Sequence, residues 1–427
     1  MPRTLGPLEG LRQRLPANPR WWSAGVALLL LASVPGVRQY LVHWPDEIWQ
    51  VDLEVYREGA HSLLLGRPVY DYLTSAPQYL PMTYPPFSAL LGLPLLAVPF
   101  GVAGWLWTAF QLWLLWITVG MAFRPLLQRF GHRSALAQGA VAGVLIQLQP
   151  LQEGIRFGQV NAILVALCLA DVVRTGQRRW PMGSLVGIAA AVKLTPAVFW
   201  VHWATARRWR VLAVSVGTAA AATLLTALVA PSSTSAYWTQ ALLDPGRLGP
   251  NNGTSNQSIR GMLLRVMGDT NPALSLTWLV LVLAVGVFGY WLAARLHRLG
   301  EDVAVVGTVG FLAVLISPVS WVHHLHWGVV VIAALVGDGR QWRRVAAGAL
   351  TAVVLYFKLP STGTSMVLSG RGPYWFARVV ENSYCLLAVL ALAAMWWFLV
   401  RGRSVPDART EPEPAAAPVE SAEVPAG

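Results

Sequence analysis

Two carboxylates, Asp52 and Glu54, open a polar segment that runs from residue 51 to residue 87 in an otherwise apolar part of the chain. They follow a hydrophobic run long enough to cross a membrane. Acids placed where a chain leaves the bilayer remain in water, and they can act on a substrate held at the membrane surface. We predict that Asp52 is a general base that removes a proton from an attacking hydroxyl, with Glu54 in a positioning role. The alternative is that both are solvated loop acids.

Three of the eight histidines fall within four positions, at His323, His324 and His326, close to Trp321. A zinc site is the obvious competitor. However, adjacent histidines cannot face one site on a regular helix, and neither a cysteine nor a carboxylate flanks them. We therefore predict no metal and no other cofactor, although the acids of the first polar loop leave metal recruitment open. His323 or His324 is expected to bind a phosphate or a sugar hydroxyl instead.

Amide and ammonium groups in apolar runs mark further candidates, because such groups are costly at membrane depth. Gln159 and Asn161 begin one run, where they could bind sugar hydroxyls or where Asn161 could cap a helix. Lys193 lies inside another run, with no acid near it in sequence. It suits a phosphate, toward which lysine acts as a point charge, or its side chain simply reaches toward the membrane interface.

Residues 251–265, with the sequence NNGTSNQSIRGMLLR, combine amides and hydroxyls with two arginines. The segment is either part of a binding site or an ordinary polar loop that leads into a helix capped near Ser258. The candidates within it are Asn256, Gln257, Arg260 and Arg265.

The composition is that of a membrane protein. Of 427 residues, 55% are hydrophobic and 12% are charged, and the mean hydropathy is +0.50, whereas soluble domains carry about 25% charged residues. The formal charge of +12 does not indicate nucleic-acid binding, because the arginines lie in short loops between apolar runs, as in cytoplasmic loops. The two cysteines lie inside apolar runs and form no disulfide framework.

The apolar runs predict an all-α polytopic membrane protein of about 12 transmembrane helices. A basic cytoplasmic segment 1–20 precedes a membrane domain 21–403, and a Pro- and Glu-rich tail 404–427 is expected to be disordered. The acidic loop 43–84 should lie outside and carry a short amphipathic helix on the membrane, ended by Gly66 and Pro68. The runs are 21–42, 86–100, 101–123, 135–148, 159–173, 181–204, 211–230, 274–294, 303–318, 325–337, 345–357 and 383–400.

One run, 181–204, is predicted to be broken at Lys193–Pro196, because proline interrupts a helix and broken backbone is tolerated where it lines a cavity. A second irregularity is expected around Pro99–Gly101. The break resolves a conflict between simple alternation of spans and the basic loops near residues 124–133 and 174–179. It places Lys193 on the outer side with the other polar motifs.

Several motifs then occur in a fixed order between residues 52 and 324, and they resemble a known family. They are Asp52-x-x-Val-Tyr56, Leu65-Gly-Arg-Pro-Val-Tyr70, Tyr84-Pro-Pro-Phe87, Gly158-Gln-Val-Asn161, Ala191-Val-Lys-Leu-Thr-Pro196, Asn256-Gln-Ser258 with Arg265, and Ser317-Pro-x-Ser-Trp-x-His-His324. The set resembles the actinobacterial polyprenol-phosphate-mannose-dependent α-1,2-mannosyltransferases, above all those that act on phosphatidylinositol mannosides. These are membrane glycosyltransferases of the GT-C class. A related branch transfers arabinofuranose, so the sugar stays open.

The resemblance implies a multi-pass enzyme of the bacterial plasma membrane with its active site on the extracytoplasmic side. The donor would be polyprenyl-phosphate mannose and the acceptor a mannosylated glycolipid, joined with inversion. Asp52 would be the base, with His323 or His324 in the active site. Positive charge for the leaving phosphate would come from Lys193, an arginine and a histidine. The residues expected to bind the donor phosphate or sugar are Lys193, Gln159, Asn161, Asn256, Gln257, Arg260, Arg265, Tyr56, Glu54, Tyr84 and Trp321.

Two other classes compete with an enzyme. A secondary transporter also combines about twelve spans, broken helices and buried polar groups. A lipid-linked sugar flippase without catalysis would bind the same donor. Against the transporter, the two halves of the sequence show no repeat, and the polar groups concentrate in the outer loops.

Overall fold

The computed structural model describes residues 19–43, 49–76, 78–173, 180–249, 251–268 and 271–403. Within these ranges the chain consists of helices, turns and loops, with two isolated bridges, Leu73 to Pro81 and Asn256 to Trp321. The predicted all-α class is therefore confirmed. Most of the predicted segment 1–20, residues 44–48 of the first polar loop, residues 174–179 and the tail 404–427 lie outside the described residues.

The first half of the chain carries the catalytic candidates of the first polar loop and the helices that support them. Its helices are α2 (Pro19–Val37), η1 (Arg38–Val42), α3 (Val51–Leu64), α4 (Phe87–Gly92), η3 (Leu93–Ala97), α5 (Phe100–Ala122), α6 (Arg124–Leu127), η4 (Gln128–Arg133), α7 (Ser134–Leu145), α8 (Gln149–Phe157), α9 (Asn161–Val172), α10 (Ser184–Val192), η5 (Thr195–Ala197), α11 (Val198–Thr205) and α12 (Trp209–Val229).

The second half carries the polar loop 251–258 and the histidine segment, residues 317–327, which contains His323, His324 and His326. Its helices are α13 (Pro231–Ala236), η6 (Tyr237–Ala241), η7 (Pro245–Leu248), α14 (Ile259–Met267), α15 (Pro272–Arg298), α16 (Asp302–Ile316), η8 (Val322–Trp327), α17 (Gly328–Val336), α18 (Trp342–Tyr356), α19 (Leu359–Ser369), α20 (Tyr374–Glu381), α21 (Ser383–Met395) and η9 (Trp396–Val400).

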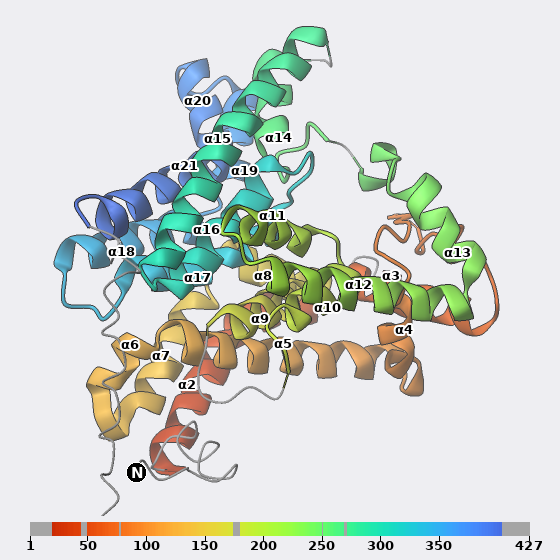
Figure 1. Cartoon of the computed structure of the whole chain (residues 1–427), viewed down its shortest axis with the longest axis horizontal. Helices are drawn as coiled ribbons and strands as arrows, with labels where there is room; N and C mark the ends of the chain where they lie inside the picture. The colour runs from red at the N-terminus through yellow and green to blue at the C-terminus, as the bar shows by residue number, and fades with distance from the viewer. Residues whose placement is uncertain are drawn as a thin grey trace, which may run out of the picture.

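The two halves pack as neighbouring groups of helices. In the first, α9 and α10 lie between α5 and α12, and α2 pairs with α7 (Figure 1). The α2–α7 contact is close because glycines meet there: a Cβ on Gly139 would lie 2.1 Å from the carbonyl oxygen of Gly25. In the second group, α15, α16, α17 and α18 pack in succession. The groups meet at several helix pairs, and at one of these places α8 and α9 pack against η8, so the histidine segment lies beside α8.

The described residues contain five single helices that are long and apolar enough to cross a membrane, or up to seven spans if each of two bent pairs counts as one. Four more apolar helices, such as Asn161–Val172 and Asp302–Ile316, are shorter than a span. The protein is therefore membrane-embedded, but the predicted number of about 12 spans is not confirmed. Figure 1 shows the longest of the five, α15, extending well beyond its neighbours at one end.

The predicted break in the run 181–204 is confirmed. Helix α10 ends at Val192, Lys193 has extended backbone with φ −148° and ψ 130°, and α11 begins at Val198 after a single short turn. The irregularity expected around Pro99–Gly101 also occurs, since η3 ends at Ala97 and α5 begins at Phe100. Both breaks fall at prolines, which lack the N–H that a continuing helix needs.

The helix predicted in the first polar loop is α3, and it is followed by Gly66, whose φ of +64° suits glycine. Its apolar face is not free to lie on a membrane, however. Leu53, Tyr56 and Ala60 are buried, because α3 packs against α4 and η3. The helix was expected on a membrane surface, but a protein surface covers it, and this contact fixes the orientation of Asp52.

Candidate active site

A cavity of about 270 Å³ lies where the start of α3, residues 78–84, the end of α8 and the histidine segment meet. Charged and polar side chains line it together with apolar ones. Five of the residues predicted from the sequence line it: Asp52, Tyr84, Gln159, Trp321 and His323. The first and last of these are 271 positions apart (323 − 52) and come from different groups of helices, so the fold builds a single site from distant motifs.

Asp52 stands in the first turn of α3, and a buried anchor sets its position. Gln50, the residue before the helix, has left-handed backbone with φ +50°, and its side-chain amide donates to Thr108 Oγ1 at 2.8 Å and to the Gly104 carbonyl at 3.2 Å on α5. The Gln50 N–H donates to the carbonyl of Arg156 at the end of α8. The start of α3 is thus held by two other helices.

The electrostatics at Asp52 suit a base. Burial raises the pKa of its carboxyl to about 6, against lowering influences from a hydrogen bond with Gln159 and from the positive charge of Lys193. A carboxylate with this pKa is still ionised at neutral pH, and it holds a proton more strongly than an ordinary aspartate. That combination favours proton removal from a hydroxyl.

Gln159 joins the carboxylate to two tyrosines. Its Oε1 lies 3.3 Å from the hydroxyl of Tyr56 and 3.4 Å from that of Tyr84, and these hydroxyls are 3.0 Å apart. The phenols fix which end of the amide is the acceptor, so its NH₂ is directed to Asp52. The preceding Gly158 has φ +71°, and a Cβ there would lie 2.7 Å from the Cβ of Leu53. Only glycine allows this approach of the two segments.

Lys193 and His324 form a second pair. Lys193 Nζ lies 2.9 Å from His324 Nε2 and 5.0 Å from the ring centre of Tyr84. The other ring nitrogen of His324, Nδ1, accepts the backbone N–H of Trp321 at 3.1 Å. His324 is thereby held from both sides and does not line the cavity. Its contact holds the ammonium of Lys193 at the break between α10 and α11.

His323 is the histidine whose ring borders the cavity. Its Nε2 is buried and has no hydrogen-bond partner, and its ring packs edge-on against Phe157 and His324. The carbonyl of His323 accepts the side-chain NH₂ of Asn161 at 2.9 Å, so Asn161 holds the segment rather than facing the cavity. The geometry thus separates two histidines that the sequence left equivalent.

Three predicted residues of the loop 251–265 lie outside the cavity wall, with their polar atoms bonded to the protein. Asn256 Oδ1 accepts the N–H groups of Ser258 and Ser320, at 3.2 and 2.9 Å. Gln257 donates to the carbonyls of Thr254 and Glu381. These bonds hold the loop against the histidine segment and the end of α20.

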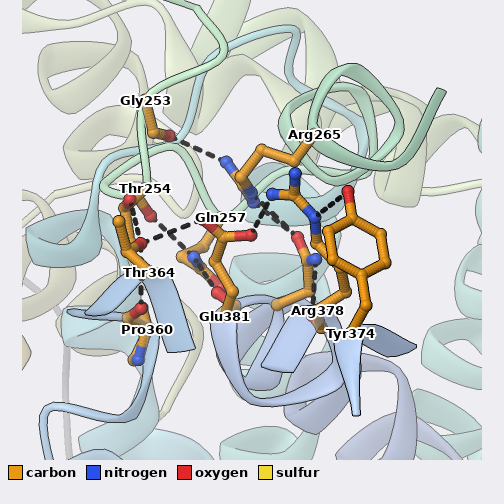
Figure 2. A network of polar contacts seen from close by, with 10 residues as sticks. Gly253, Thr254, Gln257, Arg265, Pro360, Thr364, Tyr374, Arg378 and Glu381 are labelled. Atoms are coloured by element: carbon orange, nitrogen blue, oxygen red, sulfur yellow. Dashed lines mark hydrogen bonds and ion pairs between the residues drawn. The ribbon is translucent and has the colours of Figure 1, made fainter. Parts of the chain in front are cut away.

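Arg265 belongs to the same polar network, which Figure 2 shows. Its guanidinium donates to Asn382 Oδ1 at 2.7 and 3.0 Å and to the carbonyl of Gly253 at 2.7 Å. On α20, Arg378 donates to Glu381 at 2.6 Å and to the hydroxyl of Tyr374. The network joins α14, α19, α20 and the start of α21 without reaching the cavity.

Arg260 and Glu54 are also placed away from the cavity. Arg260 lies over the ring of Trp278, 5.8 Å from its centre. Glu54 accepts the hydroxyl of Tyr72 at 3.2 Å and the N–H of Ser75 at 3.3 Å, and so holds the loop that follows α3. The two acids of the first turn therefore diverge: Asp52 faces the cavity and Glu54 the loop.

Two charged residues of the cavity wall were not predicted, Glu153 and Arg247. Glu153 lies on α8 and pairs with Arg156 at 3.5 Å. Its signal was available, because residues 149–157 carry several polar groups between two apolar runs. Arg247 lies in η7, where an isolated arginine in a loop gives no sequence signal. Among the described residues, no group of three or more His, Cys, Asp and Glu side chains could hold a metal ion.

The described residues form an all-helical membrane protein, and its cavity is lined by a buried carboxylate, an amide and a histidine. The sequence profile of "Glycosyltransferase family 87" matches residues 82–318, and the chain belongs to that family. It is thus a membrane glycosyltransferase of the GT-C class.

Two relatives illustrate the likeness. The chain is 32% identical over 332 residues to the polyprenol-phosphate-mannose-dependent alpha-(1-2)-phosphatidylinositol mannoside mannosyltransferase of Mycolicibacterium smegmatis, which covers 72% of this chain and 74% of the relative. It is 33% identical over 342 residues to the corresponding phosphatidylinositol pentamannoside mannosyltransferase of Mycobacterium tuberculosis, over 78% and 77% of the two chains. No solved structure matches significantly.

Proposed function

We propose that this glycosyltransferase moves mannose from polyprenyl-phosphate mannose to a phosphatidylinositol mannoside, with inversion at the anomeric carbon and with Asp52 as the general base. The names of the relatives support the donor and the acceptor. One observation carries the role of Asp52: it is the carboxylate on the cavity wall that Gln159 orients and whose pKa is about 6.

The proposed reaction is a single displacement. An acceptor hydroxyl oxygen attacks the anomeric carbon, and the bond from that carbon to the phosphate oxygen breaks. Asp52 takes the hydroxyl proton, and the polyprenyl phosphate leaves with the bonding electron pair. The leaving group needs positive charge rather than a proton, so the residues around it act electrostatically. The scheme uses no metal, and we propose that the enzyme needs none.

Lys193 and His323 are the residues that we propose for the donor. Lys193 is held by His324 at 2.9 Å and acts on the charge of Asp52, so it lies within electrostatic reach of the reacting atoms. His323 offers a buried Nε2 without a partner on the cavity wall, which suits a sugar hydroxyl or a phosphate oxygen. Tyr84 and Trp321 line the same cavity and supply aromatic surface for the sugar.

We further propose that the cavity opens on the extracytoplasmic side of the bacterial plasma membrane. The support is the distribution of charge. The loop 43–84 carries six acids and two bases, whereas arginines gather at 295–298, 340–344 and 401–403, which the positive-inside rule assigns to the cytoplasm.

The deciding experiment is transfer by the purified full-length chain in proteoliposomes. Polyprenyl-phosphate mannose and a phosphatidylinositol mannoside are supplied, and the product is analysed for linkage and anomeric configuration, with and without a chelator. We expect an added α-1,2-mannose in both conditions. Transfer of arabinofuranose in place of mannose, or binding of the donor without any transfer, would overturn the proposal. Loss of transfer with the chelator would overturn its metal-independent part.

A further inference from the structure

Arg247 is a charged residue of the cavity wall whose known contacts involve no acid. It lies in η7, and its Nη2 donates to the carbonyl of Tyr70 at 2.6 Å and, more weakly, to that of Met82 at 3.4 Å. Its guanidinium also lies 5.9 Å from the ring centre of Tyr70. Among the described residues, no carboxylate lies within ion-pair distance of it. The full positive charge therefore remains at the cavity wall.

One donor of this guanidinium is buried and unused. Arg247 Nε has no hydrogen-bond partner. A buried polar group without a partner is costly, and such groups are uncommon unless a ligand or water completes them. Guanidinium is planar and presents its donors as a fork that matches the oxygens of a phosphate. The bonds to Tyr70 and Met82 fix the plane of that fork.

The two arginines that the sequence offered for the donor phosphate are bonded elsewhere. Arg265 donates its hydrogen bonds to Asn382 and to the carbonyl of Gly253, and Arg260 lies over the ring of Trp278. Lys193 contacts His324 and lies in the field of Asp52. In an inverting displacement the base and the leaving group occupy opposite faces of the sugar, so a second cation, besides the Lys193 that we propose for the donor, has a place on the phosphate side.

We propose that Arg247 binds the phosphate of the lipid-linked donor and retains it as the polyprenyl phosphate leaves. This inference rests on the proposed function. Arg247 then supplies the arginine that neither Arg260 nor Arg265 provides. Because the same guanidinium bonds to carbonyls at both ends of the segment 70–82, phosphate binding and the position of that segment are linked.

The test measures binding separately from transfer. Affinity for a short-chain polyprenyl phosphate, without sugar, is compared with affinity for the phosphatidylinositol mannoside in wild type, Arg247→Lys and Arg247→Gln. We expect Arg247→Gln to weaken polyprenyl-phosphate binding about tenfold or more, and Arg247→Lys less, because lysine keeps the charge without the fork. Acceptor affinity should stay unchanged. Arg371→Gln removes an exposed arginine between α19 and α20 and serves as the matched control.

The outcomes separate the possible failures. Unchanged polyprenyl-phosphate affinity in Arg247→Gln, with transfer of mannose by the wild type, overturns the role of Arg247 and leaves the proposed function intact. A wild type that does not bind polyprenyl phosphate overturns the proposed function itself. If Arg247→Gln lowers donor and acceptor affinity together and makes the segment 70–82 sensitive to protease, Arg247 is only a structural clamp and the inference fails.

Discussion

Gln159 and Gln257 are both buried glutamines, but their hydrogen bonds differ in kind. Gln159 binds the hydroxyls of two tyrosines through its oxygen and directs its NH₂ to Asp52, a carboxylate on the cavity wall. Gln257 binds backbone only: its NH₂ donates to the carbonyls of Thr254 and Glu381, and its oxygen accepts the N–H of Cys385. One amide orients the carboxylate that we propose as the base, and the other joins two segments.

The same contrast separates the cavity residues from the polar network in Figure 2. At the cavity, His323 and Arg247 each keep a buried nitrogen without a partner. In the polar network, Arg265 donates hydrogen bonds from its Nε and both terminal nitrogens to Asn382 Oδ1 and to the carbonyl of Gly253. The comparison teaches that residue type does not identify a binding group in this protein. What separates His323 and Arg247 from Arg265 is whether the protein has already satisfied their donors and acceptors.

The largest effect is expected at the cavity carboxylate. Asp52→Asn keeps the shape of the side chain and removes the base, so we expect transfer to fall by about 10²–10⁴-fold. Donor binding should persist, measured with polyprenyl-phosphate mannose. Glu54→Gln, in the same helical turn, is the matched control, because Glu54 bonds to Tyr72 and Ser75 instead. Transfer near the wild-type rate in Asp52→Asn would remove this residue as the base.

Gln257→Leu should act on stability. It leaves the carbonyl of Glu381 and the N–H of Cys385 buried without their side-chain partner, which we expect to cost about 2–4 kcal/mol of unfolding free energy. The measurement is thermal unfolding in detergent, alongside kcat/KM for the folded fraction. We expect kcat/KM to change little. A variant with wild-type Tm but greatly reduced transfer would place Gln257 with the cavity residues and contradict the difference drawn between Gln159 and Gln257.

Gln159→Leu should show the opposite pattern. Its hydrogen bond lowers the pKa of Asp52, so its loss should move that pKa above about 6 and shift the acidic limb of the pH profile of kcat/KM upward. We expect transfer at neutral pH to fall by about tenfold, with a Tm change smaller than that of Gln257→Leu. An unmoved pH profile would contradict the contact between Gln159 and Asp52.

The smallest effect is the pH dependence of the wild type. Because the base must be ionised, kcat/KM should fall about twofold between pH 7 and pH 6, about fivefold between pH 6 and pH 5, and about tenfold per unit below that. The free energy of unfolding should depend on pH in the opposite direction, because ionised Asp52 favours activity but destabilises the fold. The pKa of Asp52 is raised from 3.8 to about 6 in the folded state, so its ionisation costs folding free energy above pH 6. This cost fades as pH falls and is absent below about 3.8. Asp52→Asn should therefore be at least as stable as wild type at pH 7.

Local chemistry accounts for what the sequence could predict. The break at Lys193–Pro196 and the helix over 51–64 follow from proline and from helical spacing, and both are present. The number of spans could not be read in the same way. Runs such as 159–173 and 325–337 were counted as spans, yet their α-helices have 12 and 9 residues, fewer than the roughly 20 that a bilayer requires.

Which candidate residues line the cavity and which only hold the fold together could not be predicted, because this depends on hydrogen-bond partners far away in the chain. Asn256 is bonded to Ser320, 64 residues on, and Gln257 to Glu381, 124 residues on. Before the fold is known, an amide that awaits a sugar and an amide that holds a carbonyl look alike. Arg247 was missed for the converse reason: a lone arginine in a loop resembles any solvated cation until the fold places it on a cavity wall.

The length of α15 has a consequence for the lipid around the enzyme. Its 27 residues extend about 40 Å, roughly 10 Å more than the hydrocarbon core of a typical bilayer. Its last turn carries Arg295, His297 and Arg298, which anchor that end among headgroups. The excess therefore emerges at the opposite end, on the side where α14 precedes α15 in the chain, unless the helix tilts. Acyl-chain length thus sets how high this side of the protein stands above the membrane surface, or how far the helix leans.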